Sequence, residues 1–363
     1  MKLSGLFYIS SSLLFCVSSQ RTLVVFGDDS VSYGNNFPSS SGVSYYNGRM
    51  SNGPLWTEYA AYFSGNNIIN YAYQGAVSNN TFVGKLVKES LSVPSLYEQV
   101  RTFGQNFGGK LDKNSIANDT VVISVGTNDI KMLKGLIQNN SVKFVSYVGN
   151  VIASVIDGVS YMRSLGYTRF VISNLPQVSR MPYFSDSSVL TKVQMDLATT
   201  VINALLLTKL KVLKLSDKGF SKSYVLDNFS FQALMIPESK VLNSVGISKM
   251  GSACYNATAD SLNLLTCSDP RNFYFLDSSN PTTMVNGFYG AMVSEFLNGT
   301  DFTFTTNFAK NLANKYMLSK IYSGTSDDNY LNSNMLSGVG GLTTNVADSI
   351  IRMDQIIADK SQS

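Results

Sequence analysis

The sequence contains no histidine in its 363 residues. Histidine is the side chain that most readily accepts and returns a proton near neutral pH, and it is the commonest protein ligand for metals. Cysteine is also scarce, with three residues, and charged residues make up 14% of the chain, against roughly 25% in an ordinary soluble domain. Catalysis by a histidine base is therefore excluded from the start, and a metal site would lack its usual ligands.

Runs of charge and long apolar runs are also missing from most of the chain. The formal net charge is +4, and the positive residues are dispersed without a basic run, so nothing indicates nucleic-acid binding. After the N-terminal region, no segment is apolar over the roughly 20 residues that a bilayer-spanning helix needs. We expect a protein that does not span a membrane.

The first nineteen residues have the pattern of a secretory signal peptide. Met1-Lys2 supplies a positive start, Leu6 to Val17 is mostly apolar, and Val17-Ser18-Ser19 is a small-residue cleavage site. An uncleaved membrane anchor is the weaker alternative, because the apolar run is too short to span a bilayer. The sequence therefore predicts that residues 1–19 are removed and that the protein is secreted.

Cysteine and asparagine usage fit an extracellular protein. Cys16 leaves with the signal peptide, so Cys254 and Cys267 remain as an even pair, for which we expect a disulfide. We expect no metal site and no cofactor, because two thiols without a histidine make a poor zinc site. N-glycosylation is predicted from six Asn-x-Ser/Thr triplets, though not at all of them. The triplets begin at Asn79, Asn118, Asn139, Asn228, Asn256 and Asn298.

Short apolar segments alternate with helical patterns along the chain. This alternation predicts an α/β fold, in which a mostly parallel sheet is covered by helices on both faces. Sites on such sheets lie beyond the carboxyl ends of the strands, where Gly27, Gly75, Gly126 and Asp277 all fall. We expect strands at Leu23–Phe26, Ile68–Tyr73, Val121–Val125, Arg169–Ser173, Tyr224–Asp227 and Phe273–Asp277. We expect helices at Pro54–Phe63, Ser146–Leu165 and Val193–Leu215.

The chain divides into a signal peptide at residues 1–19, one domain at 20–300 and a C-terminal extension at 301–363. In the extension, Phe308–Tyr322 and Asn345–Asp359 are expected to be helical, and the segment between them is rich in Gly, Ser and Asn. The extension either packs on the domain or binds a partner. The sequence leaves its role and the oligomeric state open.

Five segments carry a family resemblance. They are FGDDSVSYGNN (Phe26–Asn36), GRMSNGPLWTEYAA (Gly48–Ala61), NYAYQGA (Asn70–Ala76), VGTND (Val125–Asp129) and CSDPRNFYFLDSSNPTT (Cys267–Thr283). In this order and spacing they resemble the blocks of the GDSL or SGNH lipases and esterases, and most closely their fungal and plant branch. The resemblance covers roughly residues 22 to 300. It implies the SGNH hydrolase fold, a three-layer α/β/α sandwich, and an activity on ester bonds.

The resemblance also assigns positions in the family's active site. In these enzymes a first-block serine is the nucleophile, and a last-block aspartate and histidine complete the triad. A second-block glycine and a third-block asparagine help to bind the oxyanion. Here the oxyanion positions hold Gly75 and Asn128, and the triad aspartate position holds Asp277. The nucleophile position, however, holds Asp29, and the histidine position holds Asn280.

These two substitutions remove the ordinary mechanism. A serine hydroxyl is a weak nucleophile until an adjacent base takes its proton, and the amide of Asn280 cannot do so. A gap in the first block would promote Ser30 to nucleophile, but no histidine exists to activate it. Loss of a triad member leaves only a residual rate enhancement of roughly 10³–10⁴, and two members are missing. The three positions Asp29, Asn280 and Asp277 are therefore expected to be vestigial.

We expect the Asp29 carboxylate to accept hydrogen bonds from Gly75 N–H and the Asn128 amide. Asn280 would donate to Asp29 or Asp277, and the pocket would be satisfied and inert. The protein would then bind an acyl or glycan ligand, or an extracellular protein partner. The alternative is an extracellular hydrolase of ester or glycosidic bonds that uses Asp29 and Asp277 as a carboxylate pair.

Four further residues are expected to be structural. Arg49, in the GRMSNG stretch, is expected to hold loops together, and Trp56 to pack a helix against the sheet. Asp119 and Asp129 flank the third predicted strand. Contact of Arg49 with a ligand, or stacking of a sugar on Trp56, is the minority alternative.

Overall fold

The computed structural model describes most of the chain. The described residues are 20–35, 45–138, 144–217, 219–220, 222–237, 240–257, 264–322 and 346–361. The predicted signal peptide, the Asn139 triplet and the Gly-, Ser- and Asn-rich segment at 323–341 lie outside them.

A five-stranded sheet forms the centre of the fold. Its order is β2-β1-β3-β4-β5, and every neighbouring pair is parallel. The strands are β1 (Thr22–Gly27), β2 (Asn67–Asn70), β3 (Thr120–Ser124), β4 (Arg169–Ser173) and β5 (Lys222–Leu226). Predicted and observed strands agree to within a few residues at their ends. Parallel strands need long crossovers, and the helices between them fill that role.

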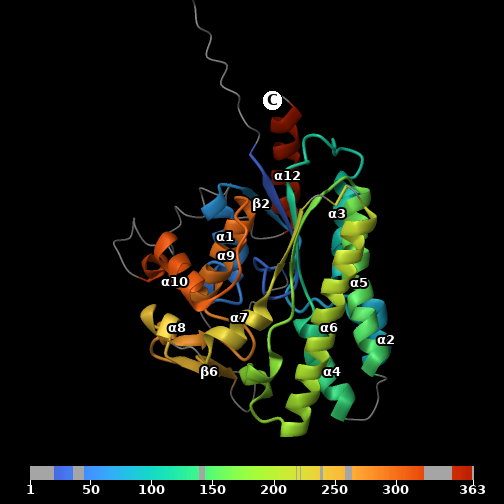
Figure 1. The fold of residues 1–363 in the computed structure, drawn as a ribbon. Helices are drawn as coiled ribbons and strands as arrows, with labels where there is room; N and C mark the ends of the chain where they lie inside the picture. The colour runs from blue at the N-terminus through green and yellow to red at the C-terminus, as the bar shows by residue number, and fades with distance from the viewer. Residues whose placement is uncertain are drawn as a thin grey trace, which may run out of the picture.

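Helices cover both faces of this sheet, as Figure 1 shows. One layer contains α2 (Asn80–Val87), α3 (Leu96–Phe107), α4 (Thr127–Gln138), α5 (Phe144–Ser164) and α6 (Val189–Ser216). The other contains α1 (Trp56–Ser64), α7 (Asn228–Met235), α8 (Lys240–Ser244), α9 (Thr283–Leu297) and α10 (Thr306–Lys315). The fold is a three-layer α/β/α sandwich, as the sequence predicts.

The strands are apolar on both faces because both faces are covered. Along β1, Leu23 and Val25 contact one hydrophobic core while Val24 and Phe26 contact the other. Successive side chains of a strand point to opposite faces, so a continuous apolar run is the pattern of a doubly covered strand. None of the described helices is long and apolar enough to cross a membrane.

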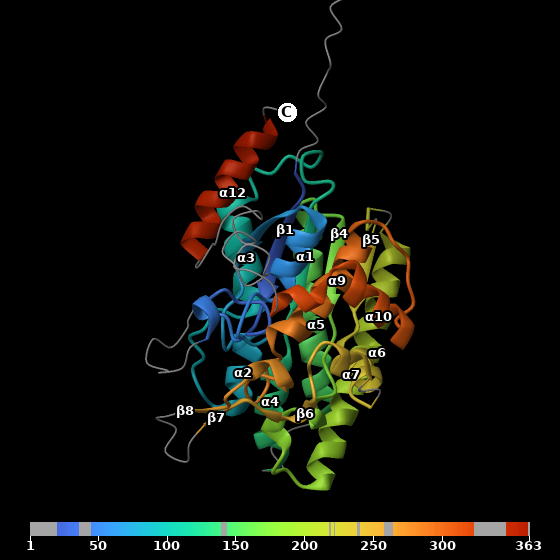
Figure 2. The ribbon, with the colours of Figure 1, turned by 90° about the vertical axis from the view of Figure 1, so that its left-hand side faces the viewer.

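A smaller β region lies at the end of the molecule that also holds α4 (Figure 2). β6 (Lys249–Ala253) pairs in parallel with β9 (Phe273–Phe275), and β7 (Tyr255–Ala257) pairs antiparallel with β8 (Leu264–Thr266). The predicted strand at Phe273–Asp277 is therefore β9, which pairs with β6 and ends two residues earlier. Short 3-10 turns are η1 (Tyr46–Gly48), η2 (Val178–Arg180), η3 (Pro182–Phe184), η4 (Pro270–Asn272) and η5 (Leu318–Ile321).

The described part of the C-terminal extension packs on the domain. Leu312 of α10 and Ile321 of η5 belong to one core, and Met353 of α12 (Val346–Ser361) belongs to the other. The hydroxyl of Ser349 accepts from Asn70 N at 3.3 Å and donates to Asn70 O at 2.9 Å. α12 thereby covers the end of β2, an edge strand whose backbone groups would otherwise stay unpaired.

The tightest helix contact in the second layer gives a stability prediction. A Cβ at Gly290 of α9 would lie 2.8 Å from Trp56 O and 3.0 Å from Ala60 N of α1. We expect Gly290→Ala to lower the free energy of unfolding by about 1–3 kcal/mol, because backbone atoms must shift. The exposed helical Gly135 is the matched control, since a Cβ added there would have nothing within 4 Å. Gly135→Ala should stabilise by about 0.5–1 kcal/mol. Urea denaturation of both variants tests this, and equal effects would contradict it.

Candidate active site

The turn after β1 brings two carboxylates and a serine to the carboxyl end of the sheet. β1 ends at Gly27, whose φ is +150°, and a Cβ there would overlap the Ser124 carbonyl oxygen. Only glycine fits both conditions. The side chain of Gln99, on α3, accepts from Gly27 N at 2.8 Å and donates to Gly27 O at 2.9 Å. Asp28 N then donates to Ser124 O at 2.9 Å, which ties the turn to β3.

Asp29 lies between the two predicted oxyanion donors. Gly75 N donates to Asp29 Oδ1 at 3.2 Å, and Asn128 Nδ2 donates to Asp29 Oδ2 at 2.6 Å. Gly75 lies in the loop after β2, and Asn128 lies in the first turn of α4. Both hydrogen bonds expected from the sequence are present, so the donors are occupied by a side chain of the protein itself.

Asp277 and Asn280 form the other half of the site. Asn280 Nδ2 donates to both Asp277 oxygens, at 3.1 and 3.0 Å, and not to Asp29. Asp277 Oδ1 also accepts from the backbone N–H groups of Ser279 and Asn280, each at 2.8 Å. The hydroxyl of Tyr45 donates to Asp277 Oδ2 at 3.1 Å. Burial, first, and the Asp277 charge raise the pKa of Tyr45, so this hydroxyl keeps its proton.

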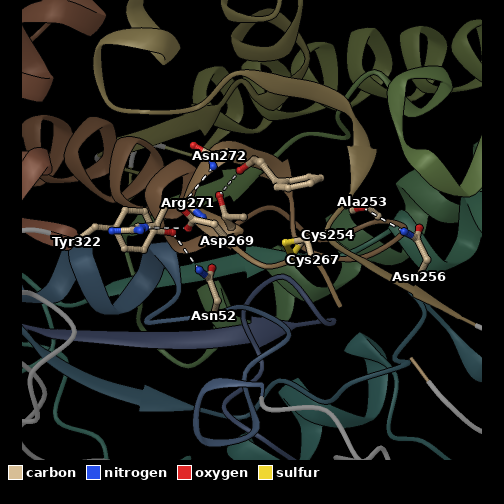
Figure 3. The surroundings of a disulfide bond; sticks show 11 residues. Asn52, Ala253, Cys254, Asn256, Cys267, Asp269, Arg271, Asn272 and Tyr322 are labelled. Carbon is tan, nitrogen blue, oxygen red and sulfur yellow. Dashed lines mark hydrogen bonds and ion pairs between the residues drawn. A yellow bond between two sulfur atoms is a disulfide. The ribbon is translucent and has the colours of Figure 1, made fainter. Parts of the chain in front are cut away.

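The predicted disulfide supports this half of the site. Cys254 and Cys267 are bonded, and Tyr255 packs edge-on against the ring of Tyr45 with 5.6 Å between the centroids. Tyr255 N donates to Leu276 O at 2.6 Å, which ties the disulfide segment to the residue before Asp277. Figure 3 shows the disulfide between Asn256 on one side and the Asp269–Arg271 ion pair on the other.

A cavity of about 60 Å³ opens beside Asp29 at the carboxyl ends of β1, β3 and β4. Its polar wall includes Asp28, Ser30, Ser124, Asn228 and Gln232, together with Asp29 and Asn280. Its apolar wall includes Met50, Leu55, Trp56, Met181, Phe275 and Tyr289. The volume corresponds to roughly four water-sized spheres, so the cavity fits only a small group. Trp56 therefore lines the cavity as well as packing α1.

Ser30 is hydrogen-bonded within this wall. Its hydroxyl donates to Asp28 Oδ1 at 2.8 Å and lies 2.8 Å from the Ser124 hydroxyl. Asp28 is buried, with an exposure of 1%. Burial, first, and the charge of Asp29 raise the pKa of Asp28 to about 7, although the Ser30 hydrogen bonds and the charge of Lys131 lower it. A carboxylate of this kind can accept a proton from Ser30 near neutral pH.

Comparison with known proteins assigns the chain to a family. Residues 23–223 match the family model described as GDSL-like Lipase/Acylhydrolase. The chain belongs to this GDSL family. Among solved structures, an extracellular lipase from Streptomyces rimosus matches with 15% identity and a TM-score of 0.31, covering 77% of this chain and 100% of that one. No curated protein matches the chain. The fungal and plant branch stays a prediction.

Several site residues of this GDSL-family chain were not predicted from its sequence. Tyr45, Ser124 and Gln232 lie outside the five resembling segments and carry no signal of their own, and the only signal at Asn228 is its glycosylation triplet. Asp28 stands inside the first segment, where two consecutive aspartates precede a serine. This pair of aspartates is the sequence signal that could have indicated a second carboxylate in the cavity wall.

The described triplet asparagines differ in how accessible they are. Asn118, Asn256 and Asn298 are exposed, and Asn79 is half-buried at the start of α2. Asn228, however, lines the cavity, and its Nδ2 donates to Ser173 Oγ at 2.7 Å and to Asn174 O at 3.2 Å. A glycan on this nitrogen would replace one of the two engaged hydrogens. We therefore remove Asn228 from the asparagines expected to carry a glycan in the folded protein.

The raised pKa of Asp28 gives a pH-dependent stability prediction. Its ordinary value is 3.8 and its folded value is about 7, so the folded state binds this proton more tightly. Stability from Asp28 is therefore lost as pH rises from about 4 to about 7. Asp28→Asn should raise the free energy of unfolding by roughly 2–4 kcal/mol at pH 8 and hardly at all at pH 4. The charged groups acting on Asp28 are Asp29, in the same turn, and Lys131, on α4.

Denaturation curves at pH 4 and pH 8 test this prediction. Asp129 is a second buried carboxylate, and burial raises its pKa to about 6. The Asp28→Asn variant keeps Asp129, so the variant should still lose some stability between pH 4 and pH 8. Asp301→Asn, at an exposed position, is the matched control. An Asp28→Asn variant that is less stable than the native protein at pH 8 would contradict the prediction.

Proposed function

We propose that this GDSL-family protein is secreted, no longer hydrolyses esters, and uses its former active site to bind a ligand or a protein partner. The observation that carries the proposal is the pair of hydrogen bonds from Gly75 N and Asn128 Nδ2 to the Asp29 carboxylate. Acyl transfer needs such donors free for the oxygen on which negative charge develops. Here a fixed negative charge already occupies them.

The absence of a histidine base supports the same conclusion. Asn280 takes the histidine position and donates its amide to Asp277, so it has no proton-accepting nitrogen to offer. Ser30 does have a carboxylate neighbour in Asp28, at 2.8 Å. An attack by Ser30 would nevertheless build negative charge beside Asp29, with the oxyanion donors already engaged. Both steps of ester hydrolysis are therefore disfavoured.

Hydrolysis by an Asp29 and Asp277 carboxylate pair is the competing function. In such a mechanism one carboxyl group must donate a proton to the leaving group. Asp277 accepts from four donor groups, which are Tyr45 O–H, Ser279 N–H, Asn280 N–H and Asn280 Nδ2. Asp29 accepts from two more. These contacts suit two carboxylates that act as acceptors, so we favour binding over carboxylate catalysis.

Covalent labelling with a fluorophosphonate, which reacts with activated serines, tests the proposal. We expect the purified secreted protein to stay unlabelled at every serine, because no base activates a serine beside free oxyanion donors. Ser30→Ala and Asp277→Asn should behave like the native protein. Stoichiometric labelling that Ser30→Ala abolishes would identify Ser30 as a working nucleophile and overturn the proposal. An active serine esterase labelled in parallel controls for the reagent.

A further inference from the structure

Three residues that line the cavity beside Asp29 each carry a buried side-chain oxygen atom that has no hydrogen-bond partner among the described residues. They are Asp28 Oδ2, Asn228 Oδ1 and Gln232 Oε1. All three residues line the same cavity, and Asp28 and Gln232 are only 1% and 3% exposed. A buried polar atom without a partner costs roughly 1–3 kcal/mol, so three around one cavity indicate that its occupant donates hydrogen bonds.

The orientation of these groups is set by their neighbours. Asn228 Nδ2 donates to the Asn174 carbonyl oxygen, which can only accept, so Asn228 Oδ1 is the atom left over. Asp28 Oδ1 accepts hydrogen bonds from the N–H and the O–H of Ser30, so Asp28 Oδ2 is the oxygen without a partner. Gln232 Oε1, one turn farther along α7 than Asn228, is the third buried oxygen without a partner among the described residues. The polar atoms without a partner in these three lining residues are therefore all acceptors.

The charge of the wall is negative. Asp28 and Asp29 both line the cavity, and no lysine or arginine is among its described lining residues. Lys131 of α4 acts on Asp28 from a distance, and its ammonium group donates to Asn128 Oδ1 at 3.3 Å. An anionic carboxylate ligand would meet two like charges. A cation with N–H groups suits the wall better.

The apolar part of the cavity wall favours an organic cation over a metal ion as the ligand. Trp56, Phe275, Tyr289 and Met181 supply ring and thioether surface, and a calcium ion requires six to eight oxygen ligands. Among the described residues, no group of three or more His, Cys, Asp or Glu side chains could hold a metal. A primary ammonium has three N–H donors and a carbon substituent that can rest on aromatic faces.

We propose that the cavity binds the primary ammonium group of a small organic cation, whose three N–H groups donate to Asp28 Oδ2, Asn228 Oδ1 and Gln232 Oε1. This proposal rests on the proposed function, in which the site binds a ligand instead of hydrolysing one, and it names the class of that ligand. It replaces an acyl group or an uncharged glycan as the occupant of this cavity.

Binding should strengthen as pH rises through 7. Burial and the charge of Asp29 hold the pKa of Asp28 at about 7, and a cation binds the ionised form. Asp29, in the same turn, and Lys131, on α4, are the charged groups that act on Asp28. Affinity for an alkylammonium ion should therefore be about tenfold higher at pH 8 than at pH 6.

Trp56 provides the measurement, because it is the single tryptophan of the chain and lines the cavity. We would titrate the full secreted protein with n-propylammonium chloride at constant ionic strength and follow tryptophan fluorescence. Sodium butyrate, 1-propanol and calcium chloride are the comparison ligands. We expect a saturable change with n-propylammonium only, and a Kd about tenfold weaker or more in Asp28→Asn and in Gln232→Leu. Asp301→Asn, exposed and outside the cavity, should bind like the native protein.

Three results would overturn the ammonium proposal. They are no saturable response to n-propylammonium, tighter binding of butyrate or calcium, and unchanged affinity in both cavity variants. Melting curves establish that the variants are folded, and Gln232→Leu carries the test if Asp28→Asn does not fold. Fluorophosphonate labelling is independent of this titration. If a serine is labelled and the protein also binds ammonium, only the proposed loss of ester hydrolysis is overturned. If no serine is labelled and the protein binds no ammonium, only the proposed ligand class is overturned.

Discussion

Asp29→Ser combined with Asn280→His is expected to raise the rate of nitrophenyl butyrate hydrolysis about 10²–10⁴-fold over the native protein, the usual contribution of a positioned general base. The first substitution removes the carboxylate that engages Gly75 N and Asn128 Nδ2, which frees these donors for an oxyanion. It also places a hydroxyl at the position where the family resemblance expects the nucleophile. The second supplies an imidazole next to Asp277.

The environment of Asn280 is suited to that imidazole. Asn280 Nδ2 already donates to both oxygens of Asp277, so an imidazole N–H in the same place would meet the same acceptor. Asp277 would hold the ring and stabilise its protonated form, the role an aspartate has in such a triad.

Three controls make the experiment decisive. Asp29→Ser alone and Asn280→His alone should stay near the native rate, because members of a triad act as a unit. Adding Asp277→Asn to the double variant should remove most of the gain. If the folded double variant hydrolyses the ester no faster than the native protein, Asp29 and Asn280 are not the residues that limit hydrolysis at this site.

Arg49→Met is expected to lower the free energy of unfolding by about 3–5 kcal/mol, the largest single effect on stability that we predict. Arg49 and Glu58 form an ion pair with 2.8 Å between Nη2 and Oε1, and their side chains are 0% and 1% exposed. Arg49 Nη1 also donates to Asn47 O at 2.8 Å. Removing the arginine leaves the carboxylate of Glu58 buried without its cation, although Leu55 N still donates to Oε2 at 2.8 Å.

Two variants separate the buried charge from the lost volume. Arg49→Met combined with Glu58→Gln should be less destabilised than Arg49→Met alone, because no buried charge then lacks its partner. Lys110→Met, which breaks an exposed ion pair with Asp354, should cost no more than about 1 kcal/mol. Urea denaturation measures all three. A loss below about 1 kcal/mol for Arg49→Met would show that Arg49 does not hold the Tyr46–Gly48 turn as the geometry indicates.

The fold was predictable because its strands and long helices carry strong local patterns. β1, β3 and β4 are short apolar runs that end in turns, and α5 and α6 are long segments with helical spacing. α9 was not predicted, because all of its residues are buried and it has no polar face to reveal its period. β9 was placed correctly but its partner, β6, was not, because Lys249–Ala253 is largely exposed and has no apolar run.

The candidate site was predictable only where motifs mark it. Asp29, Gly75, Asn128, Asp277 and Asn280 were found by position in the resembling segments, and the structure brings them into two hydrogen-bonded groups. The cavity was not predictable, because its wall combines residues from after β1, β3, β4 and β5 and from the start of α9. These residues come together only in the folded protein, and their spacing along the chain does not predict the cavity.

Turnover of nitrophenyl butyrate by the native protein, measured beside Asp277→Asn, tests the central claim most directly. If Asp29 occupies the oxyanion donors and no histidine base is present, both proteins should hydrolyse the ester at the buffer rate. A native protein that turns over the ester, and loses that activity on Asp277→Asn, would contradict the account and make the carboxylates the catalysts to explain.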